Sequence, residues 1–342
     1  MSTENRDRVK DRAPTSIDVA KHAGVSQATV SRFLNGHPVS DEMQAAITRA
    51  IADLGYRPNH AARSLVTNQT RVIAVVLGDL LNGYYGELYT TIHAALTQHG
   101  FRPLVMEGRV SVPNGPGQLL SEVQADGVIV ATSLMRPEQE RVIIDQQLPT
   151  VMLNRTSFKS VDNVGTENHL GGMLAARHLL SLGHQRLGMI VGPAGADAVV
   201  ARSAGFCEEL AKSGMSLDEG DIDPAGFDYH LAHAAAIRML SRTRRPSAIF
   251  CHNDQLAIAT LNAATALGIK VPEELSVVGF DDVGMAAWER FSLTTIKQPI
   301  QEIAACAVDL LMARLNDRQR PVQSFTLPCR LIQRGSTGPM KN

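Results

Sequence analysis

Residues 15–66 read TSIDVAKHAGVSQATVSRFLNGHPVSDEMQAAITRAIADLGYRPNHAARSLV, and this stretch decides the fold of the first part of the chain. It contains two short helical patterns that a turn of small residues separates. The first covers residues 17–23, with Ser16 as its expected N-cap, and the second covers residues 27–35, with Ser26 as its expected N-cap. A hydroxyl at an N-cap accepts a hydrogen bond from a backbone amide that lacks a partner inside the helix.

The apolar residues of the two patterns fall on one shared face. This inward face consists of Val19, Ala20, Ala23, Val25, Val30 and Leu34, and the side chains left outward are Gln27, Ala28, Ser31 and Arg32. Two helices arranged in this way predict a helix-turn-helix, whose second helix lies in the major groove of DNA.

Short polar side chains favour DNA binding over a plain three-helix packing module. Both would bury the same apolar residues, but only DNA binding calls for small polar groups that suit phosphate oxygens. Such groups stand at Thr15, Ser26, Thr29, Ser31 and Asn35.

A third helix and a hinge-like segment follow. The third helix is expected over residues 41–54, capped by Ser40, and Asn59 can cap a short helix over residues 60–66 before the polar TNQT stretch. Seven residues are fewer than the ~12 to 15 that hold a helix together alone in water. We therefore expect two such helices to form when they pack together on DNA, which would provide a switch; the alternative is a flexible tether.

From residue 71 onward the pattern alternates between buried strands and helices. Strands are expected at 71–77, 102–107, 127–130, 150–153, 186–191, 247–251 and 275–280, and helices at 84–98, 137–147, 168–182, 201–212, 229–241 and 254–267. This alternation predicts parallel sheets with helices on both faces. The number of units exceeds one comfortable sheet, so we expect an α/β body of two similar lobes with a cleft between them.

Polar and aromatic side chains follow the strands of this body. Open α/β sheets bind ligands beyond the carboxyl ends of their strands, and the residues found there are Asp79, Asn82, Tyr84, Tyr85, Arg202, Asn253, Asp281 and Asp282. Arginine, asparagine and aspartate together can bind vicinal hydroxyls, and tyrosine rings offer flat apolar faces. Each residue taken alone is more simply explained as a helix cap or a turn residue. The residues after four different strands, however, all suit the same kind of ligand, a ring with hydroxyl groups.

The chain resembles the lactose/galactose repressor (LacI/GalR) family of transcriptional regulators from Thr15 to about Gly335. The motifs that carry the resemblance are DVAKHAGVSQATVSRFLNG, YRPNHAARSL, AIFCHNDQLAIA, LSVVGFDD and LTTIKQP. The resemblance implies a homodimer, or a tetramer, on a near-palindromic double-stranded operator. It also implies two Rossmann-like lobes with parallel sheets, as in periplasmic sugar-binding proteins.

The resemblance assigns roles to single positions. Gln27, Ala28 and Arg32 match base-reading positions, Arg32 as a bidentate partner of guanine and Ala28 as at most a contact to a thymine methyl. Leu65, with Ala62 beside it, matches a wedge in the minor groove at the operator centre. Asn59, at the start of the same segment, is a further predicted DNA contact. The effector positions would be Asn82, Tyr84, Tyr85, Arg202, Asn253 and Asp281, with Phe227 packed on the ligand.

Two departures from the family pattern stand out. The usual Asn-Pro-aromatic-aromatic sequence is Asn82-Gly83-Tyr84-Tyr85 here, which should loosen that loop. The segment between Glu107 and Asp126 is short and rich in Pro and Gly, so the second helix of lobe one should be truncated.

The expected domains follow from the same resemblance. They are a flexible tail (1–14), a helix-turn-helix domain (15–58), a hinge helix and linker (59–70), and an effector-binding and dimerisation domain (71–342), in which lobe one holds about 71–163 and 292–323 and lobe two about 164–291 and 324–336.

Composition limits the class of protein. The 342 residues carry a net charge of −1, with 44% hydrophobic and 20% charged residues, which is typical of a soluble globular protein. No apolar run approaches the ~20 residues of a membrane span, and the start of the chain lacks the apolar core of a secretory signal. The four scattered cysteines are expected to be buried and reduced, which suggests the cytoplasm.

Other chemistry has weaker support. His230 and His233 lie three residues apart, but no third or fourth ligand at a suitable spacing completes a metal site. The GPAGA stretch at 192–196 lacks a phosphate-binding spacing, and no serine stands in a GxSxG elbow. We therefore expect no enzyme activity, no cofactor and no metal.

These observations predict an effector-responsive repressor of carbohydrate-utilisation genes, with a sugar or sugar derivative as effector. A regulator that responds to a purine or nucleoside stays open as an alternative. So does a small-molecule sensor whose head serves mainly to dimerise. An enzyme acting on a sugar or nucleoside would instead show turnover that Asp281→Ala abolishes.

Overall fold

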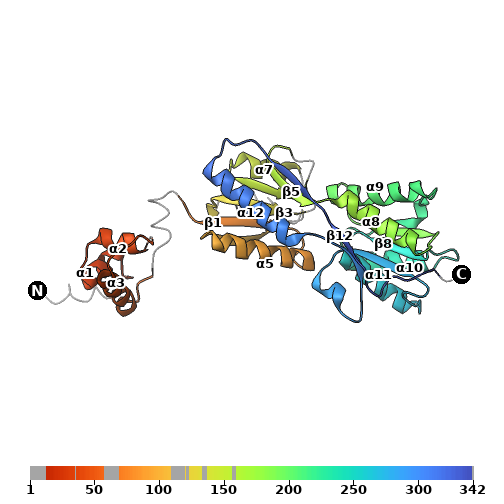
Figure 1. Ribbon diagram of the computed structural model, residues 1–342, viewed down its shortest axis with the longest axis horizontal. Coiled ribbons are helices and arrows are strands. Elements are labelled where there is room, and N and C mark those ends of the chain that lie inside the picture. Colours follow the sequence, from red (N-terminus) through yellow and green to blue (C-terminus); the bar gives the residue numbers. More distant parts are fainter. Residues whose placement is uncertain are drawn as a thin grey trace, which may run out of the picture. The chain divides into compact units, whose positions relative to one another are not determined.

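The computed structural model describes residues 13–34, 36–57, 69–108, 120, 123–132, 137–155 and 159–340. The chain divides into two compact units, Met1–Thr70 and Arg71–Asn342, which we call the head and the body. Figure 1 shows the helices of the head and the α/β layers of the body.

The head is a small helical unit, and the predicted helix-turn-helix is confirmed. It contains α1 (Ser16–Ala23), α2 (Gln27–Leu34) and α3 (Asp41–Leu54). Gly24 takes a left-handed conformation, φ 67°, in the turn between α1 and α2. The core of the head is formed by Val19, Ala20, Val30, Ile47 and Ala50, with Ala23, Val25 and Leu34 partly buried against it.

The first helix begins one residue earlier than predicted. Its N-cap is Thr15 rather than Ser16, because Thr15 and Asp18 form a capping box. The backbone amide of Thr15 donates to Asp18 Oδ2 at 2.9 Å, and the Thr15 hydroxyl accepts from the Asp18 amide at 3.4 Å. Ser40 caps α3 and Gly55 ends it, as predicted.

Lobe one of the body is a sheet of six strands in the order β11-β5-β4-β3-β1-β2. The strands are β1 (Val72–Leu77), β2 (Arg102–Glu107), β3 (Gly127–Ala131), β4 (Thr150–Leu153), β5 (Asp162–Thr166) and β11 (Ser324–Leu327), and all their pairings are parallel. The helices α5 (Gly83–Gln98) and α12 (Ile300–Asn316) pack on one face. The helix α7 (Pro137–Asp145) contributes Ile143 to the apolar cluster on the opposite face.

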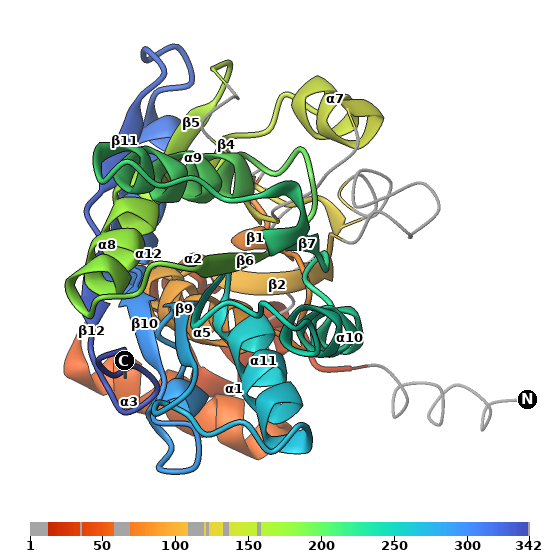
Figure 2. The same cartoon turned by 90° about the vertical axis from the view of Figure 1, so that its right-hand side faces the viewer.

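Lobe two is a second sheet of six strands, in the order β12-β10-β9-β8-β6-β7. Its strands are β6 (Leu187–Val191), β7 (Ile222–Pro224), β8 (Ala248–Cys251), β9 (Ser276–Asp281), β10 (Thr294–Lys297) and β12 (Arg330–Ile332), of which β12 runs antiparallel to β10. Figure 2 shows α8 (Asn168–Ser181) and α9 (Asp197–Lys212) on one side of this sheet, and α10 (Tyr229–Leu240) and α11 (Asp254–Ala266) on the other. Two single turns of 3-10 helix, η2 (Glu219–Asp221) and η3 (Gly284–Ala287), complete the lobe.

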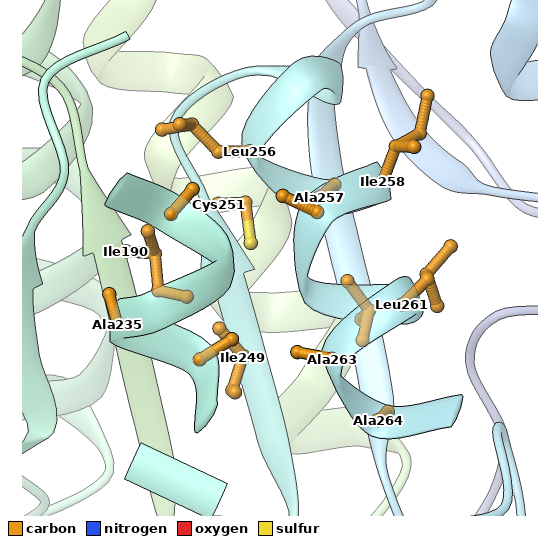
Figure 3. Close-up of a cluster of buried hydrophobic side chains, with 14 of the residues drawn as sticks. Ile190, Ala235, Ile249, Cys251, Leu256, Ala257, Ile258, Leu261, Ala263 and Ala264 are labelled. Carbon is orange, nitrogen blue, oxygen red and sulfur yellow. The ribbon is translucent and has the colours of Figure 1, made fainter. Parts of the chain in front are cut away.

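The core of lobe two is rich in small residues, which lets its helices lie close to the sheet. Figure 3 shows Ile190 and Ile249 from β6 and β8 beside Ala235 of α10 and Ala257 and Ala263 of α11. Two parallel-sheet lobes with helices on both faces confirm the predicted fold class of the body.

The chain passes between the lobes three times: after β5, between β10 and α12, and between β11 and β12. This corrects two details of the expected lobe assignment. Thr294–Lys297 was expected in lobe one but joins lobe two, because it pairs with β9. Ser324–Leu327 was expected in lobe two but joins lobe one, because it pairs with β5.

Other differences are local. The expected strands and helices did not include β5, β7, β10 and α12, and α9 begins at Asp197 rather than Ala201. Cys207 is exposed and Cys306 half-buried, so burial was wrongly expected for them; Cys251 and Cys329 are buried. The expected hinge helix at 60–66 lies outside the described residues, as does most of the shortened segment between Glu107 and Asp126. No helix in the described part of the chain is both long and apolar enough to cross a membrane.

Candidate functional site

The outer face of α2 carries the predicted DNA-reading side chains. Gln27, Ala28, Ser31 and Arg32 are all exposed. Among the described residues, the Arg32 guanidinium makes one hydrogen bond, from Nη2 to the carbonyl oxygen of Pro38, and its 3.4 Å length makes it weak. Arg32 can therefore reach a partner outside the head.

The small polar residues of the head have structural partners as well. Ser26 Oγ caps α2 by accepting from the Thr29 amide at 3.1 Å, and it also lies within hydrogen-bond distance, 2.8 Å, of Thr29 Oγ1. Thr15 caps α1. The remaining predicted DNA contacts, Asn35, Asn59, Ala62 and Leu65, lie outside the described residues.

A cavity of about 50 Å³ lies between the two lobes of the body. Its walls come from the carboxyl ends of strands and the helix starts that follow them, as expected for open α/β sheets. All seven predicted effector residues line it. The complete lining is Asn82, Tyr84, Tyr85, Ala131, Thr132, Leu153, Asn154, Ala198, Arg202, Phe227, Asn253, Asp281 and Gln298.

Lobe one contributes two tyrosines that hydrogen bonds and ring packing hold in place. Asn82 caps α5 and accepts from the Tyr84 amide at 3.0 Å. The rings of Tyr84 and Tyr85 meet edge to face at 5.3 Å. The Tyr84 hydroxyl accepts from Asn154 Nδ2 at 2.9 Å, while Asn154 Oδ1 accepts from the Thr166 amide at 2.8 Å. Burial raises the pKa of Tyr84, so its hydroxyl keeps its proton.

Lobe two contributes a buried arginine. Arg202, on α9, is 5% exposed. Its Nε donates to Asn168 Oδ1 at 2.9 Å, its Nη1 donates to the carbonyl oxygen of His252, and its guanidinium lies 3.5 Å from the centre of the Phe280 ring. Burial lowers the pKa of Arg202, although Asp281 opposes this shift.

Asp281 lies at the end of β9 and faces the point where the chain returns to lobe one. Its Oδ1 accepts from Gln298 Nε2 at 2.6 Å, and Gln298 Oε1 accepts from the Thr166 hydroxyl at 2.5 Å. Burial raises the pKa of Asp281 to about 7, and Arg202 opposes part of this rise. Asp281 also has φ 125°, a conformation rare outside glycine, which costs on the order of 1–3 kcal/mol and is common at functional sites.

A second buried carboxyl group lies behind this wall. Asp254 accepts from the Val283 amide at 2.9 Å and from the Thr295 hydroxyl at 2.5 Å, and it does not line the cavity. Burial and the neighbouring Asp281 raise its pKa. Asp254 therefore holds the segment that follows Asp281.

An asparagine and a phenylalanine complete the lobe-two wall. Asn253 caps α11 by accepting from the Leu256 amide at 2.9 Å. A side chain at Gly192 would collide with the Phe227 ring, since a Cβ built there lies 2.5 Å from it. The glycine in the loop after β6 thus leaves room for Phe227 at the cavity.

Sequence reasoning missed Thr132, Asn154 and Gln298. Thr132 and Asn154 directly follow β3 and β4, so the rule applied to the other strands would have found them. Gln298 stands in the quoted LTTIKQP motif but received no role. Asp79 and Asp282, which follow strands, do not line the cavity: Asp79 accepts from the Leu81 amide, and Asp282 forms ion pairs with Lys297 and Arg334.

This arrangement suits non-covalent binding of a small polar ring. Tyrosine and phenylalanine faces can cover the ring, while amides, a guanidinium and a carboxyl group bind its polar edge. Among the described residues, no group of three or more His, Cys, Asp or Glu side chains could hold a metal ion.

The chain matches two described protein families. Residues 17–59 match the family described as bacterial regulatory proteins, lacI family, and residues 176–337 match the periplasmic binding protein-like domain. The regulator DegA of Bacillus subtilis (strain 168) is 33% identical over 337 residues, which cover 95% of this chain and 98% of DegA. The ribose operon repressor of Escherichia coli (strain K12) is 31% identical, covering 94% of this chain and 99% of the repressor.

Solved structures agree with these relatives. A lac repressor dimer bound to operator and the anti-inducer ONPF superposes with a TM-score of 0.84 at 26% identity, covering 96% of this chain and all of that chain. A complex of the transcriptional regulator CelR with cellobiose gives a TM-score of 0.73 at 30% identity, covering 94% of this chain and 99% of that chain.

Proposed function

Since the chain belongs to the LacI family of bacterial regulatory proteins, we propose that it is a transcriptional repressor of carbohydrate-utilisation genes. Its affinity for operator DNA would depend on whether a sugar or sugar derivative is bound. The family consists of transcriptional regulators. The single observation that carries the proposal is the cavity between the lobes, because all seven residues predicted to bind the effector line it.

The head supplies the DNA-binding part of this function. Gln27, Ala28, Ser31 and Arg32 project from one exposed face of α2, the helix that enters the major groove in a helix-turn-helix. We infer that the chain acts as a homodimer that places two such helices in two half-sites. The solved relative described as a lac repressor dimer bound to operator supports this inference.

The body supplies the effector-binding part. The cavity presents Tyr84, Tyr85 and Phe227 as apolar faces. Arg202, Asn253 and Asp281 offer polar groups to hydroxyls. Relatives named for ribose and for cellobiose support a carbohydrate ligand.

Coupling between the two parts follows from the position of the cavity. Because its walls belong to both lobes, a ligand binds best when the lobes are in one relative arrangement and so stabilises that arrangement. We propose that residues 59–70 transmit the change to the head as a hinge. A coupling free energy of ~1 to 3 kcal/mol is usual for such systems.

The test combines DNA binding with ligand binding. Fluorescence anisotropy with duplexes from the gene's own promoter should give sequence-selective binding that weakens steeply with salt, because phosphate contacts release counterions. A panel of pentoses, hexoses, sugar acids and nucleosides should contain a compound that shifts this affinity by ~5 to 150-fold. A protein that binds every duplex equally, or none, would contradict the proposal.

A further inference from the structure

Lobe two contacts lobe one at the turn that follows Asp281. Val283 lies between β9 and η3 of lobe two, yet its side chain is 4% exposed and packs in the apolar cluster of lobe one. A Cβ built on Gly83, at the start of α5, would lie 3.5 Å from Val283 Cβ. This apolar contact therefore joins the two lobes at a point where the chain does not pass between them.

A hydrogen bond between the lobes lies beside this contact. The Gly284 amide donates to Glu87 Oε1 on α5 at 2.7 Å, although 197 residues separate the two in the chain. Hydrogen bonds to an ionised acceptor are shorter and stronger than those between neutral groups. We call Val283 and Gly284 of lobe two, with Gly83 and Glu87 of lobe one, the clasp.

Lobe two holds its half of the clasp in place. Asp254 Oδ2 accepts from the Val283 amide at 2.9 Å. Asp282, the residue before Val283, forms ion pairs with Lys297 at 3.1 Å and with Arg334 at 2.5 Å. Because the turn is tied to its own lobe by these contacts, a rotation of one lobe against the other must stretch or break its contacts to α5.

The clasp borders the cavity without lining it. Neither Glu87 nor Val283 is among the lining residues, whereas Tyr84, which directly follows Gly83, and Asp281, two residues before Val283, both line the cavity. The clasp is thus formed in the same lobe arrangement that brings the predicted effector residues together. A change in the clasp can alter the stability of this arrangement while the side chains of the cavity stay as they are.

Resting on the proposed function, we propose that the clasp sets the balance between two lobe arrangements, with Glu87 and Val283 as positioning residues that tune the effector response from outside the cavity. The clasp and the effector stabilise the same arrangement. Loss of the clasp therefore lowers the population of the effector-binding arrangement, and a permanent clasp raises it. Neither residue has to touch the ligand.

A disulfide can make the clasp permanent. The 3.5 Å between the two Cβ positions is within the ~3.5 to 4.5 Å found in disulfides, and Gly83 has no left-handed φ, so it can accept a side chain. The variant combines Gly83→Cys with Val283→Cys and is oxidised with diamide. Peptide mapping under non-reducing conditions identifies the bond within one chain. The parent protein treated in the same way is the control, because it carries four cysteines of its own.

Fluorescence anisotropy of the full-length double variant with its promoter duplex compares the oxidised and reduced forms. Oxidation should shift operator affinity by about fivefold or more, and reduction should reverse the shift. Calorimetry with the sugar panel should show that any sugar bound by the reduced form is bound about threefold or more tightly by the oxidised form. A folded variant that forms no disulfide, equal operator affinity in the two forms, or weaker sugar binding after oxidation would overturn the proposal.

Two substitutions loosen the clasp. Glu87→Ala removes the acceptor of the Gly284 amide, and Val283→Ala removes two methyl groups from the cluster of lobe one. Each should shift operator affinity by about threefold or more, in the direction opposite to that of the disulfide and of a bound sugar. A shift in the same direction would indicate general damage and refute the clasp. If the double variant does not fold, as circular dichroism will show, no shift in these two variants still refutes it.

Glu208→Ala and Val308→Ala are the matched controls. Glu208 is exposed on α9, and its ion pairs with His169 and Lys212 stay inside lobe two. Val308, on α12, is buried in the same apolar cluster as Val283 but belongs to lobe one. Val308→Ala should lower the melting temperature, and both controls should leave operator and sugar affinity unchanged. Affinities that move as far in the controls as in the clasp variants would contradict the proposal.

The two proposals fail in different ways. If the duplex and a sugar are bound as proposed but neither the disulfide nor the loosening substitutions change their affinities, the clasp proposal is wrong while the regulator function stands. If no duplex is bound selectively, the regulator function fails, and the sugar affinities of the oxidised and reduced forms continue to test the clasp.

Discussion

Asn154 Nδ2 donates a hydrogen bond of 2.9 Å to the Tyr84 hydroxyl, although 70 residues separate the two in the chain. Asn154 stands after β4 at φ 57°, and Gly165 gives it space, since a Cβ there would lie 2.8 Å from Asn154 Oδ1. The contact therefore depends on two neighbouring strands and orients one wall of the cavity.

Asn154→Ala should weaken effector binding by about five- to tenfold, because an intramolecular hydrogen bond contributes on the order of 1 kcal/mol. It should also lower the melting temperature, since the Thr166 amide loses its acceptor. Tyr84→Phe is the matched control for the hydroxyl: it should weaken binding while leaving the Asn154–Thr166 bond in place. Calorimetry measures the effector affinity and thermal melting measures the stability. Equal effector affinity in Asn154→Ala and the parent protein would refute the role of Asn154 in orienting Tyr84.

Asp281→Ala should abolish the effector response while operator binding persists. The substitution removes the carboxyl group from the cavity and frees Gln298, but it leaves the head untouched. Anisotropy with and without effector measures the response. Loss of operator binding with normal effector affinity would contradict the assignment of Asp281.

Effector affinity should depend on pH near neutrality. Burial raises the pKa of Asp281 to about 7; Glu87 also raises it, whereas Arg202 and the Gln298 hydrogen bond lower it, and the neighbouring Asp254 is a second buried carboxyl group with a raised pKa. A sugar hydroxyl that donates to Asp281 favours the ionised carboxyl group, so effector affinity should rise as the pH rises through about 7. Titrations of effector affinity between pH 6 and pH 8 measure the direction of this change. Asp281→Asn should remove the part of the pH dependence that comes from Asp281.

Arg32→Ala should weaken operator binding by ~1 to 3 kcal/mol and relax the preference at one base pair of each half-site. The guanidinium is exposed on α2, and within the described part of the head it has a single long contact, to the Pro38 carbonyl oxygen. Arg49→Ala provides the control, since Arg49 is an exposed arginine on α3. Anisotropy with operator variants measures the change, and equal losses on all sequences would indicate a phosphate contact instead.

Asp162→Ala should destabilise the body by about 3–5 kcal/mol, because it leaves buried arginine charge uncompensated. Asp162 is fully buried, receives two hydrogen bonds of 3.0 Å from Arg314, and pairs with Arg320 at 3.3 Å. Asp223→Ala is the control: its bidentate partner Arg238 is more than half exposed, so about 0–1 kcal/mol is expected. Urea unfolding compares the two variants, and similar midpoints would disprove the argument.

Much of the cavity could be predicted because strand ends are local features. Asn82 and Asn253 each follow a continuous apolar run, and the same run that predicts the strand places the next polar residue at the edge of the sheet. Gln298 escaped this logic, since its role arises from Asp281 and Thr166, which lie 17 and 132 residues away.

The missed strand β5 has a physical reason. Its sequence, DNVGT, is polar, yet all five residues are buried, because Asp162 is neutralised by arginines and Asn163 donates to the carbonyl oxygen of Arg155. Hydrophobic pattern cannot reveal a strand whose burial depends on partners about 150 residues ahead. The same lack of long-range information explains why β10 and β11 were assigned to the wrong lobes.

The three passages of the chain between the lobes also dictate the order in which the body can mature during synthesis. Lobe one needs Ser324–Leu327 for its last strand, and lobe two needs Arg330–Ile332. Until the ribosome has released these residues, both sheets have an uncovered edge, although all their other strands have already been made. Unpaired strand edges promote aggregation, so a nascent chain of this kind is vulnerable at two sheets at once. A stop codon shortly before Ser324 would damage both lobes together.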